Sequence, residues 1–142
     1  PARAANHTGP GQSPDFVVPA FAKQIKAIAE GTQPPVMRVG NLESERTFMD
    51  VRDIVRGYRL LIEKGECGQA YNVASSERIT MGHMLDLLCE AAGVSPEIEV
   101  DPERYRPTDR LPLLSPERLR AATGWQPAIP FKQTLRDVLE QA

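Results

Sequence analysis

The chain has 142 residues, of which 41% are apolar and 25% are charged; 17 Lys and Arg against 19 Asp and Glu give a formal net charge of −2. This length and composition suit one globular domain with its own core. A near-neutral chain without a basic stripe is not expected to bind nucleic acid. Because no stretch approaches the roughly 18 apolar residues of a membrane span and no secretory leader opens the chain, we expect a cytoplasmic protein with no membrane contact.

Cysteine and histidine are too sparse to predict a metal or redox centre. Cys67 and Cys89 lack the short spacing of a zinc or disulfide-exchange motif, so both are expected to be free thiols, Cys67 in a turn and Cys89 on a helix. The other candidate ligands, His7 and His83, are far apart in the sequence. We therefore expect no metal site.

The first half of the chain is predicted to alternate short strands with one helix. Residues 2–5 are predicted to form an exposed strand, with no strand before it to pair with. Apolar residues at helical spacing predict a helix over residues 16–30, started by the segment 13–15 and ended by Gly31. Two prolines then precede a short strand at 36–39, and residues 46–50 are expected to be extended.

The second half contains the clearest helix, which starts at the N-cap Asp50 and ends before Gly65. Residues 70–74 are predicted to form a buried strand, followed by a helix from Thr80 to Gly93 and a half-buried strand at 97–100. Ser115 as N-cap is expected to start a short helix that Gly124 ends, and residues 131–142 form the last helix. The predicted class is α/β, with helices and short strands. One apolar stripe follows the Asp50 helix: Val51, Ile54, Val55, Tyr58, Leu61 and Ile62.

Two carboxylates at the start of that helix, Asp50 and Asp53, could be a general acid–base pair. Carboxylates in a first helical turn also cap backbone amides and complement the helix dipole. We interpret both as structural. Trp125 is predicted to anchor the C-terminal loop against the core.

Two separated segments carry the strongest functional signal. The run Asn6-His7-Thr8-Gly9-Pro10-Gly11-Gln12 is followed about forty residues later by Arg46, at the head of Thr47-Phe48-Met49-Asp50-Val51-Arg52-Asp53. Together they resemble the extended short-chain dehydrogenase/reductase family, the NAD-dependent epimerases and dehydratases. The likeness is greatest to the branch that acts on GDP-linked 6-deoxyhexoses, which includes GDP-4-keto-6-deoxymannose reductase and GDP-mannose 4,6-dehydratase.

The resemblance extends over nearly the whole chain and implies a C-terminal, substrate-binding part of an extended Rossmann-type enzyme, with residues 1–142 as one domain. Strands near 2–5 and 70–74 would belong to the dinucleotide-binding sheet, whose main half is absent here. The family's Gly-rich turn and Tyr-x-x-x-Lys pair do not occur, since none of Tyr58, Tyr71 and Tyr105 has a lysine four residues on. We therefore expect no catalytic residue in this chain, no turnover by the chain alone and no NAD(P) binding without the other half.

The resemblance also implies a set of substrate-binding residues. In the family, arginines matching Arg46 and Arg106 grip the pyrophosphate of the nucleotide, and an acid matching Asp109 binds the ribose. Guanidinium groups suit this role because they donate paired hydrogen bonds and keep their charge. Asn6 would contact the sugar nucleotide, with His7 and Thr8 on the cofactor side, and Asn41 would help to enclose the base.

Each of these residues also has a simpler interpretation. Arg46 could pair with Glu43 or Glu45, Arg106 and Asp109 could form a local salt-bridged turn, and Arg104 is interpreted as a surface charge. Asn6 and Asn41 could cap turns. Their joint occurrence in the family's order favours the binding interpretation.

The predicted function is thus the nucleotide-sugar-binding portion of an NAD(P)-dependent reductase, epimerase or dehydratase, most like the GDP-4-keto-6-deoxymannose reductases. The alternatives are a part of a GDP-mannose 4,6-dehydratase and a non-catalytic sugar-nucleotide-binding or interaction module. Unpaired edges of strands 2–5 and 70–74 would favour pairing between two copies, so a homodimer is expected.

Overall fold

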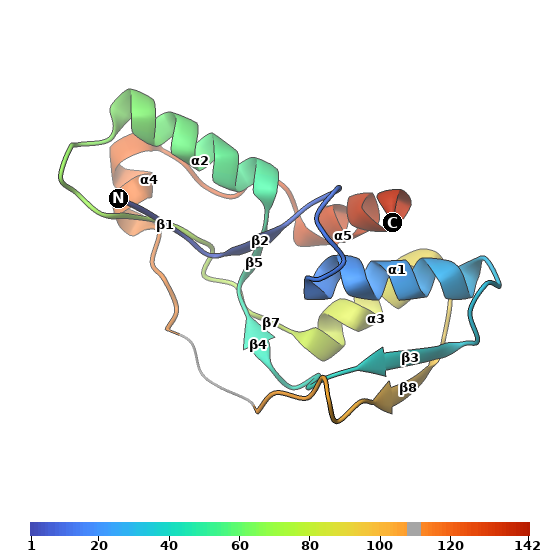
Figure 1. Cartoon of the computed structure of the whole chain (residues 1–142). Helices are drawn as coiled ribbons and strands as arrows, with labels where there is room; N and C mark the ends of the chain where they lie inside the picture. Colours follow the sequence, from blue (N-terminus) through green and yellow to red (C-terminus); the bar gives the residue numbers. More distant parts are fainter. Residues whose placement is uncertain (108–111) are drawn as a thin grey trace.

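A computed structural model describes residues 1–107 and 112–142 (Figure 1). The described residues form short strands joined by helices and loops, as expected for an α/β chain. The strands are β1 (Ala2–Ala4), β2 (Asn6–Thr8), β3 (Val36–Val39), β4 (Glu45–Arg46), β5 (Phe48–Asp50), β6 (Tyr71–Val73), β7 (Ile79–Thr80) and β8 (Glu97–Val100). The helices are α1 (Val17–Ala29), α2 (Val51–Lys64), α3 (Met81–Ala92), α4 (Glu117–Thr123) and α5 (Phe131–Gln141).

The strands pair two by two. The pairs β1–β6, β2–β5 and β3–β8 are parallel, and β4–β7 is antiparallel. In the first pair Ala2 lies opposite Tyr71, so the two strands that were expected to lack neighbours are neighbours of each other. Each therefore has one edge satisfied within the chain, which removes part of the reason for expecting strand pairing between copies.

Two hydrophobic clusters form the core. The larger one lies where α1, α3 and α5 pack together beside β3, with Ile25, Met84 and Leu135 fully buried. The smaller one joins α2 and α4 to β6, around the buried Trp125 and Ile54.

Most predicted helix ends are confirmed. The Asp50 carboxylate accepts a hydrogen bond from the amide of Arg52, and the Thr80 hydroxyl accepts one from the amide of His83. The predicted helix stops Gly93 and Gly124 have positive φ angles of 71° and 75°, a conformation that glycine adopts without the steric cost of a Cβ.

Two helix starts differ from the prediction. The helix α1 begins at Val17 without a side-chain cap, because Ser13 and Asp15 bond each other in a separate turn. The helix α4 begins at Glu117, so the N-cap position falls on Pro116 rather than on Ser115. The Ser115 hydroxyl still accepts a long hydrogen bond of 3.4 Å from the Glu117 amide, which explains why the sequence signal was displaced by one residue.

Two predicted burial patterns were wrong. On α2 the apolar stripe is only partly covered: Ile54 is buried, whereas Val55, Tyr58 and Ile62 are 57%, 38% and 88% exposed. The apolar residues of α2 spread around more of the helix surface than the side that packs against α4. Strand β8 was expected to be half-buried, yet its residues are exposed, because in the described part of the chain it pairs only with β3.

Trp125 anchors the C-terminal loop as predicted. Its indole Nε1 donates to the backbone oxygen of Asp53 at 3.0 Å, and the Arg56 guanidinium lies 5.8 Å from the ring centroid. Helix α2 can approach this ring because Gly57 faces it: a Cβ at that position would lie 2.8 Å from Val73 Cγ1 and 3.3 Å from Trp125 Nε1. A glycine in the middle of a helix is thus required by packing.

Asp50 and Asp53 connect α2 to the C-terminal part of the chain, and both are buried. Asp53 accepts hydrogen bonds from the amides of Ala128 and Ile129. Asp50 accepts one from the Thr134 hydroxyl of α5 at 2.8 Å and two from the Arg52 guanidinium, which also reaches Asp137. With every carboxylate engaged in this way, the structural interpretation of the pair holds and the acid–base interpretation loses its support.

These contacts also determine whether the Asp50 carboxyl group is ionised. Burial raises the pKa of its carboxyl group, but the hydrogen bonds from Arg52 and Thr134 and the charge of Arg52 outweigh burial, so the pKa lies below its ordinary value of 3.8. The same contacts, first with Asp50 and then with Asp137, raise the pKa of Arg52. Asp50 therefore stabilises the fold as an anion.

We expect Gly57→Ala to lower the free energy of unfolding by about 1 to 2 kcal/mol, because overpacking against Val73 and Trp125 exceeds the roughly 1 kcal/mol gain in helix propensity. Urea unfolding measures the change. Arg59→Ala on the exposed face of the same helix is the control and should stay within about 0.5 kcal/mol of the wild type. A more stable Gly57→Ala protein would mean that α2 does not pack this closely.

We expect Asp50→Asn to be less stable than the wild type at neutral pH by about 1 to 3 kcal/mol, since charged hydrogen bonds to Arg52 are lost. A group with a depressed pKa stabilises the fold fully above its ordinary pKa and loses that contribution as the pH falls through the folded-state value. The difference between the two proteins should therefore shrink as the pH falls below 3.8. Urea unfolding at several pH values measures it, and a difference independent of pH would contradict the ionised role of Asp50.

Candidate functional site

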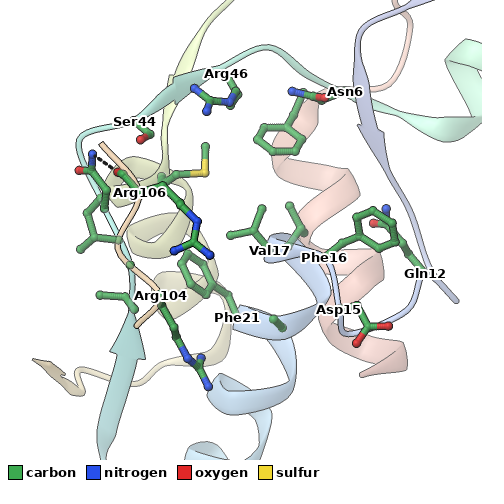
Figure 2. A pocket seen from close by; sticks show the side chains of 18 of the residues that line it. Asn6, Gln12, Asp15, Phe16, Val17, Phe21, Ser44, Arg46, Arg104 and Arg106 are labelled. Atoms are coloured by element: carbon green, nitrogen blue, oxygen red, sulfur yellow. Dashed lines mark hydrogen bonds between the residues drawn. The ribbon is translucent and has the colours of Figure 1, made fainter. Parts of the chain in front are cut away.

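An open cavity of about 890 Å³ lies between the start of α1, the end of β3, strand β4 and the segment of residues 101–106. Figure 2 shows Arg46 at the upper edge of the cavity, the Arg106 guanidinium reaching into it from the left, and Asn6 and Gln12 on the right. Asn41 lines it as well. The structure thus brings four of the five predicted substrate-binding residues to one cavity. The fifth, Asp109, lies outside the described residues.

Asn6 enters the cavity from the first residue of β2, where it lies opposite Phe48. Its side chain makes no hydrogen bond with the described part of the chain. The turn that follows is closed by other groups: the Gln12 amide donates to the Gly9 oxygen, and the Thr8 hydroxyl donates to the Gln12 side chain at 2.6 Å. The interpretation of Asn6 as the cap of this turn is therefore not supported.

Arg46 is held at the cavity wall by strand pairing. It lies in β4 opposite Ile79 of β7, and its Nη1 donates to the backbone oxygen of Glu45 at 2.7 Å. The same residue lines a second, smaller cavity of about 270 Å³, which also includes Asn6 and Arg78. Asn6 and Arg46 thus separate two adjoining spaces.

Arg106 and Arg104 come from the irregular segment after β8. The Arg106 guanidinium donates to the backbone oxygens of Glu103 and Tyr105, at 3.2 and 3.1 Å. Arg104 behaves as the surface charge that was expected, half-exposed and 3.5 Å from Asp101, but it also lines the cavity. Exposed guanidiniums of this kind can rotate from weak backbone contacts to a stronger anionic partner.

Asn41 has both ends of its side-chain amide engaged by the protein. Its Oδ1 accepts from the Glu43 amide at 3.0 Å, closing a turn, and its Nδ2 donates to the Arg106 oxygen at 2.9 Å. The turn interpretation of Asn41 is thereby confirmed.

The residues predicted for the cofactor side differ in position. His7 is half-buried, lines the cavity and has its Nδ1 2.9 Å from the Ala5 oxygen. Thr8 is buried and bonded to Gln12, so its hydroxyl does not face the cavity. Of the two, only His7 is placed to touch a molecule bound beside Asn6. The described residues contain no Gly-rich strand–helix turn that could hold a dinucleotide.

Sequence reasoning missed the apolar wall of the cavity and a close contact at its edge. Val17, Phe21 and Phe48 supply the wall. Gly40 allows the backbone of residues 101–106 to approach β3, since a Cβ there would clash with the carbonyl oxygen of Arg104.

The remaining reactive groups form no second site. Cys67 is exposed in a turn and Cys89 is half-buried on α3, both as free thiols; burial and the charge of Asp86 raise the pKa of Cys89. Within residues 1–107 and 112–142, no cluster of His, Cys, Asp and Glu is arranged to hold a metal ion. In the same ranges no helix is long and apolar enough to cross a membrane.

Comparison with known proteins identifies a matching family model and related enzymes. The model of the family described as GDP-mannose 4,6 dehydratase matches residues 2–138. GDP-6-deoxy-D-mannose reductase of Pseudomonas aeruginosa is 39% identical over 139 residues, which cover 97% of this chain and 46% of the relative. dTDP-glucose 4,6-dehydratase of Streptomyces griseus is 28% identical over 127 residues, 89% of this chain and 37% of the relative.

Solved structures agree. RMD from Pseudomonas aeruginosa, complexed with NADPH, superposes with a TM-score of 0.92 at 38% identity, over 99% of this chain and 46% of that one. A putative epimerase from Burkholderia cenocepacia gives 0.84 at 34% identity, over 98% and 45%. The chain therefore spans about half the length of the relatives it matches. It belongs to the GDP-mannose 4,6 dehydratase family of NAD-dependent epimerases and dehydratases.

Proposed function

We propose that the large cavity binds a GDP-linked 6-deoxyhexose and that this chain is the substrate-binding, C-terminal portion of an NAD(P)-dependent reductase similar to GDP-6-deoxy-D-mannose reductase. The observation that carries the proposal is the convergence of Arg46 and Arg106, 60 residues apart in the sequence, on the cavity that Asn6 also lines. Two guanidiniums match the two phosphates of a nucleoside diphosphate. A volume of about 890 Å³ lies within the range of small-molecule sites.

In this proposal the chain positions the substrate and contributes no catalytic group. The nicotinamide of the cofactor would exchange a hydride with the hexose, at a site to which the described residues contribute no acid or base. Arg46 and Arg106 hold the diphosphate, Asp109 holds the ribose, and Asn6 orients the hexose, with His7 toward the cofactor. Binding energy from the distant nucleotide thereby holds the reacting carbon in place, which lowers the entropic part of the barrier.

The second candidate is a GDP-mannose 4,6-dehydratase, which the description of the matching family model favours. The two reactions differ in redox balance: a reductase consumes one NADPH per sugar, whereas a 4,6-dehydratase returns the hydride to the same sugar and consumes none. Incubating a protein that contains this chain and the dinucleotide-binding half with each GDP-sugar, while following NADPH absorbance and sugar products, separates them. A non-catalytic module would bind the GDP-sugar and convert neither.

We expect Arg46→Ala and Arg106→Ala each to weaken binding of the GDP-sugar by one to two orders of magnitude, because each removes charge-assisted hydrogen bonds worth roughly 1.5 to 3 kcal/mol. Lysine at either position should restore only part of the affinity, since it brings the charge without the planar fork. Calorimetric titration measures these changes, and NAD(P) affinity of the complete enzyme should barely move.

Arg59→Ala is the matched control, because Arg59 is a highly exposed arginine on α2 away from the cavity. It should leave GDP-sugar affinity unchanged. Equal affinities for the wild type, Arg46→Ala and Arg106→Ala would reduce both arginines to surface charges and would refute the proposed site.

A further inference from the structure

Three consecutive residues at the end of β3, Val39, Gly40 and Asn41, hold the segment that carries Arg106. The Val39 oxygen accepts from the Asp101 amide at 2.8 Å, which extends the β3–β8 ladder by one step. At Gly40 the two backbones come so close that an added Cβ would clash with the carbonyl group of Arg104. Asn41 Nδ2 then donates to the Arg106 oxygen at 2.9 Å, the bond drawn as a dashed line in Figure 2. The backbone of residues 101–106 is therefore fixed to the end of β3 at both ends and in the middle.

Of these three contacts, the Asn41 hydrogen bond is the one made with Arg106 itself. Among the described residues, Arg106 lies outside every helix and strand, and its guanidinium donates to the backbone oxygens of Glu103 and Tyr105. In the described part of the chain, Asn41 is the side chain that reaches the backbone of Arg106 from a different element. The position from which the Arg106 side chain enters the cavity therefore depends on a hydrogen bond to the loop after β3.

We propose that Asn41 is a positioning residue, which presents Arg106 to the diphosphate and does not itself bind the base. This inference rests on the proposed function, and it replaces the direct ligand role that the sequence had suggested for Asn41. Its Oδ1 is used by the Glu43 amide and its Nδ2 by the Arg106 oxygen. These two bonds hold the Asn41 amide against the protein and tie the turn after β3 to the backbone of Arg106.

The distinguishing variant is Asn41→Ser. The serine hydroxyl can still accept from the Glu43 amide and so keep the turn, but it is too short to reach the Arg106 oxygen. The ligand is GDP alone, titrated by calorimetry into the wild type, Asn41→Ser, Arg106→Ala and the double variant, with thermal unfolding of each protein as the folding check. Arg59→Ala again serves as the unaffected control.

We expect Asn41→Ser to weaken GDP binding about two- to tenfold, the effect of one ordinary hydrogen bond. In the Arg106→Ala background the same substitution should change affinity by less than about twofold, because the group that Asn41 positions is gone. Non-additivity of this kind separates a positioning role from a direct contact and from a general loss of stability.

Each other outcome overturns the inference in a recognisable way. An equal loss in both backgrounds means that Asn41 binds GDP directly, and no loss in either means that the Arg106 backbone keeps its place without Asn41. If Arg106→Ala leaves GDP affinity unchanged, Arg106 is not a ligand and the inference fails with it. If the folded wild type binds no GDP, the proposed function itself fails.

Discussion

The first turn of α2 is the contact on which the rest of the arrangement depends. Asp50 and Asp53, buried on adjacent sides of that turn, accept hydrogen bonds from Thr134 and from the amides of Ala128 and Ile129. Since α2 belongs to the smaller hydrophobic cluster and α5 to the larger, these bonds join the two clusters. Burying a carboxylate costs free energy unless its hydrogen bonds are all made, so the contact between the first turn of α2 and the C-terminal part of the chain has one favourable geometry. The stacked rings of Phe48 and Phe131, 5.9 Å apart, support it on the side of the cavity.

This contact at the first turn of α2 also determines where the residues that line the cavity lie. Asp50 is the last residue of β5, and β5 pairs with β2, which places Asn6 opposite Phe48. Two residues before Phe48, Arg46 pairs with β7, whose next element is α3 of the larger cluster. The opposite wall is attached independently, through the bonds between the end of β3 and residues 101–106. One cationic side chain therefore comes from each of two separately anchored walls, which explains how residues far apart in the sequence reach one space.

Local signals in the sequence predicted the elements well. The caps Asp50 and Thr80 and the stops Gly93 and Gly124 placed helix ends because capping depends on a few neighbouring residues. The burial of Val55, Tyr58, Ile62 and β8 was mispredicted, since periodicity shows that a face is apolar and not what covers it. The convergence of Asn6, Arg46 and Arg106 was expected only from the family resemblance. The contacts of Gly40 and Asn41 with residues 104 and 106 could not be predicted, because they depend on how two loops distant in sequence approach each other.

The central claim is that Arg46 and Arg106 hold a diphosphate between the two walls. A crystal structure of the protein soaked with GDP tests it most directly. The account predicts phosphate density between the two guanidiniums, with Arg106 turned from the Glu103 and Tyr105 oxygens toward the ligand and the Asn41 bond to its backbone retained. Density for GDP elsewhere on the molecule, or bound in the cavity with neither arginine in contact with its phosphates, would contradict it.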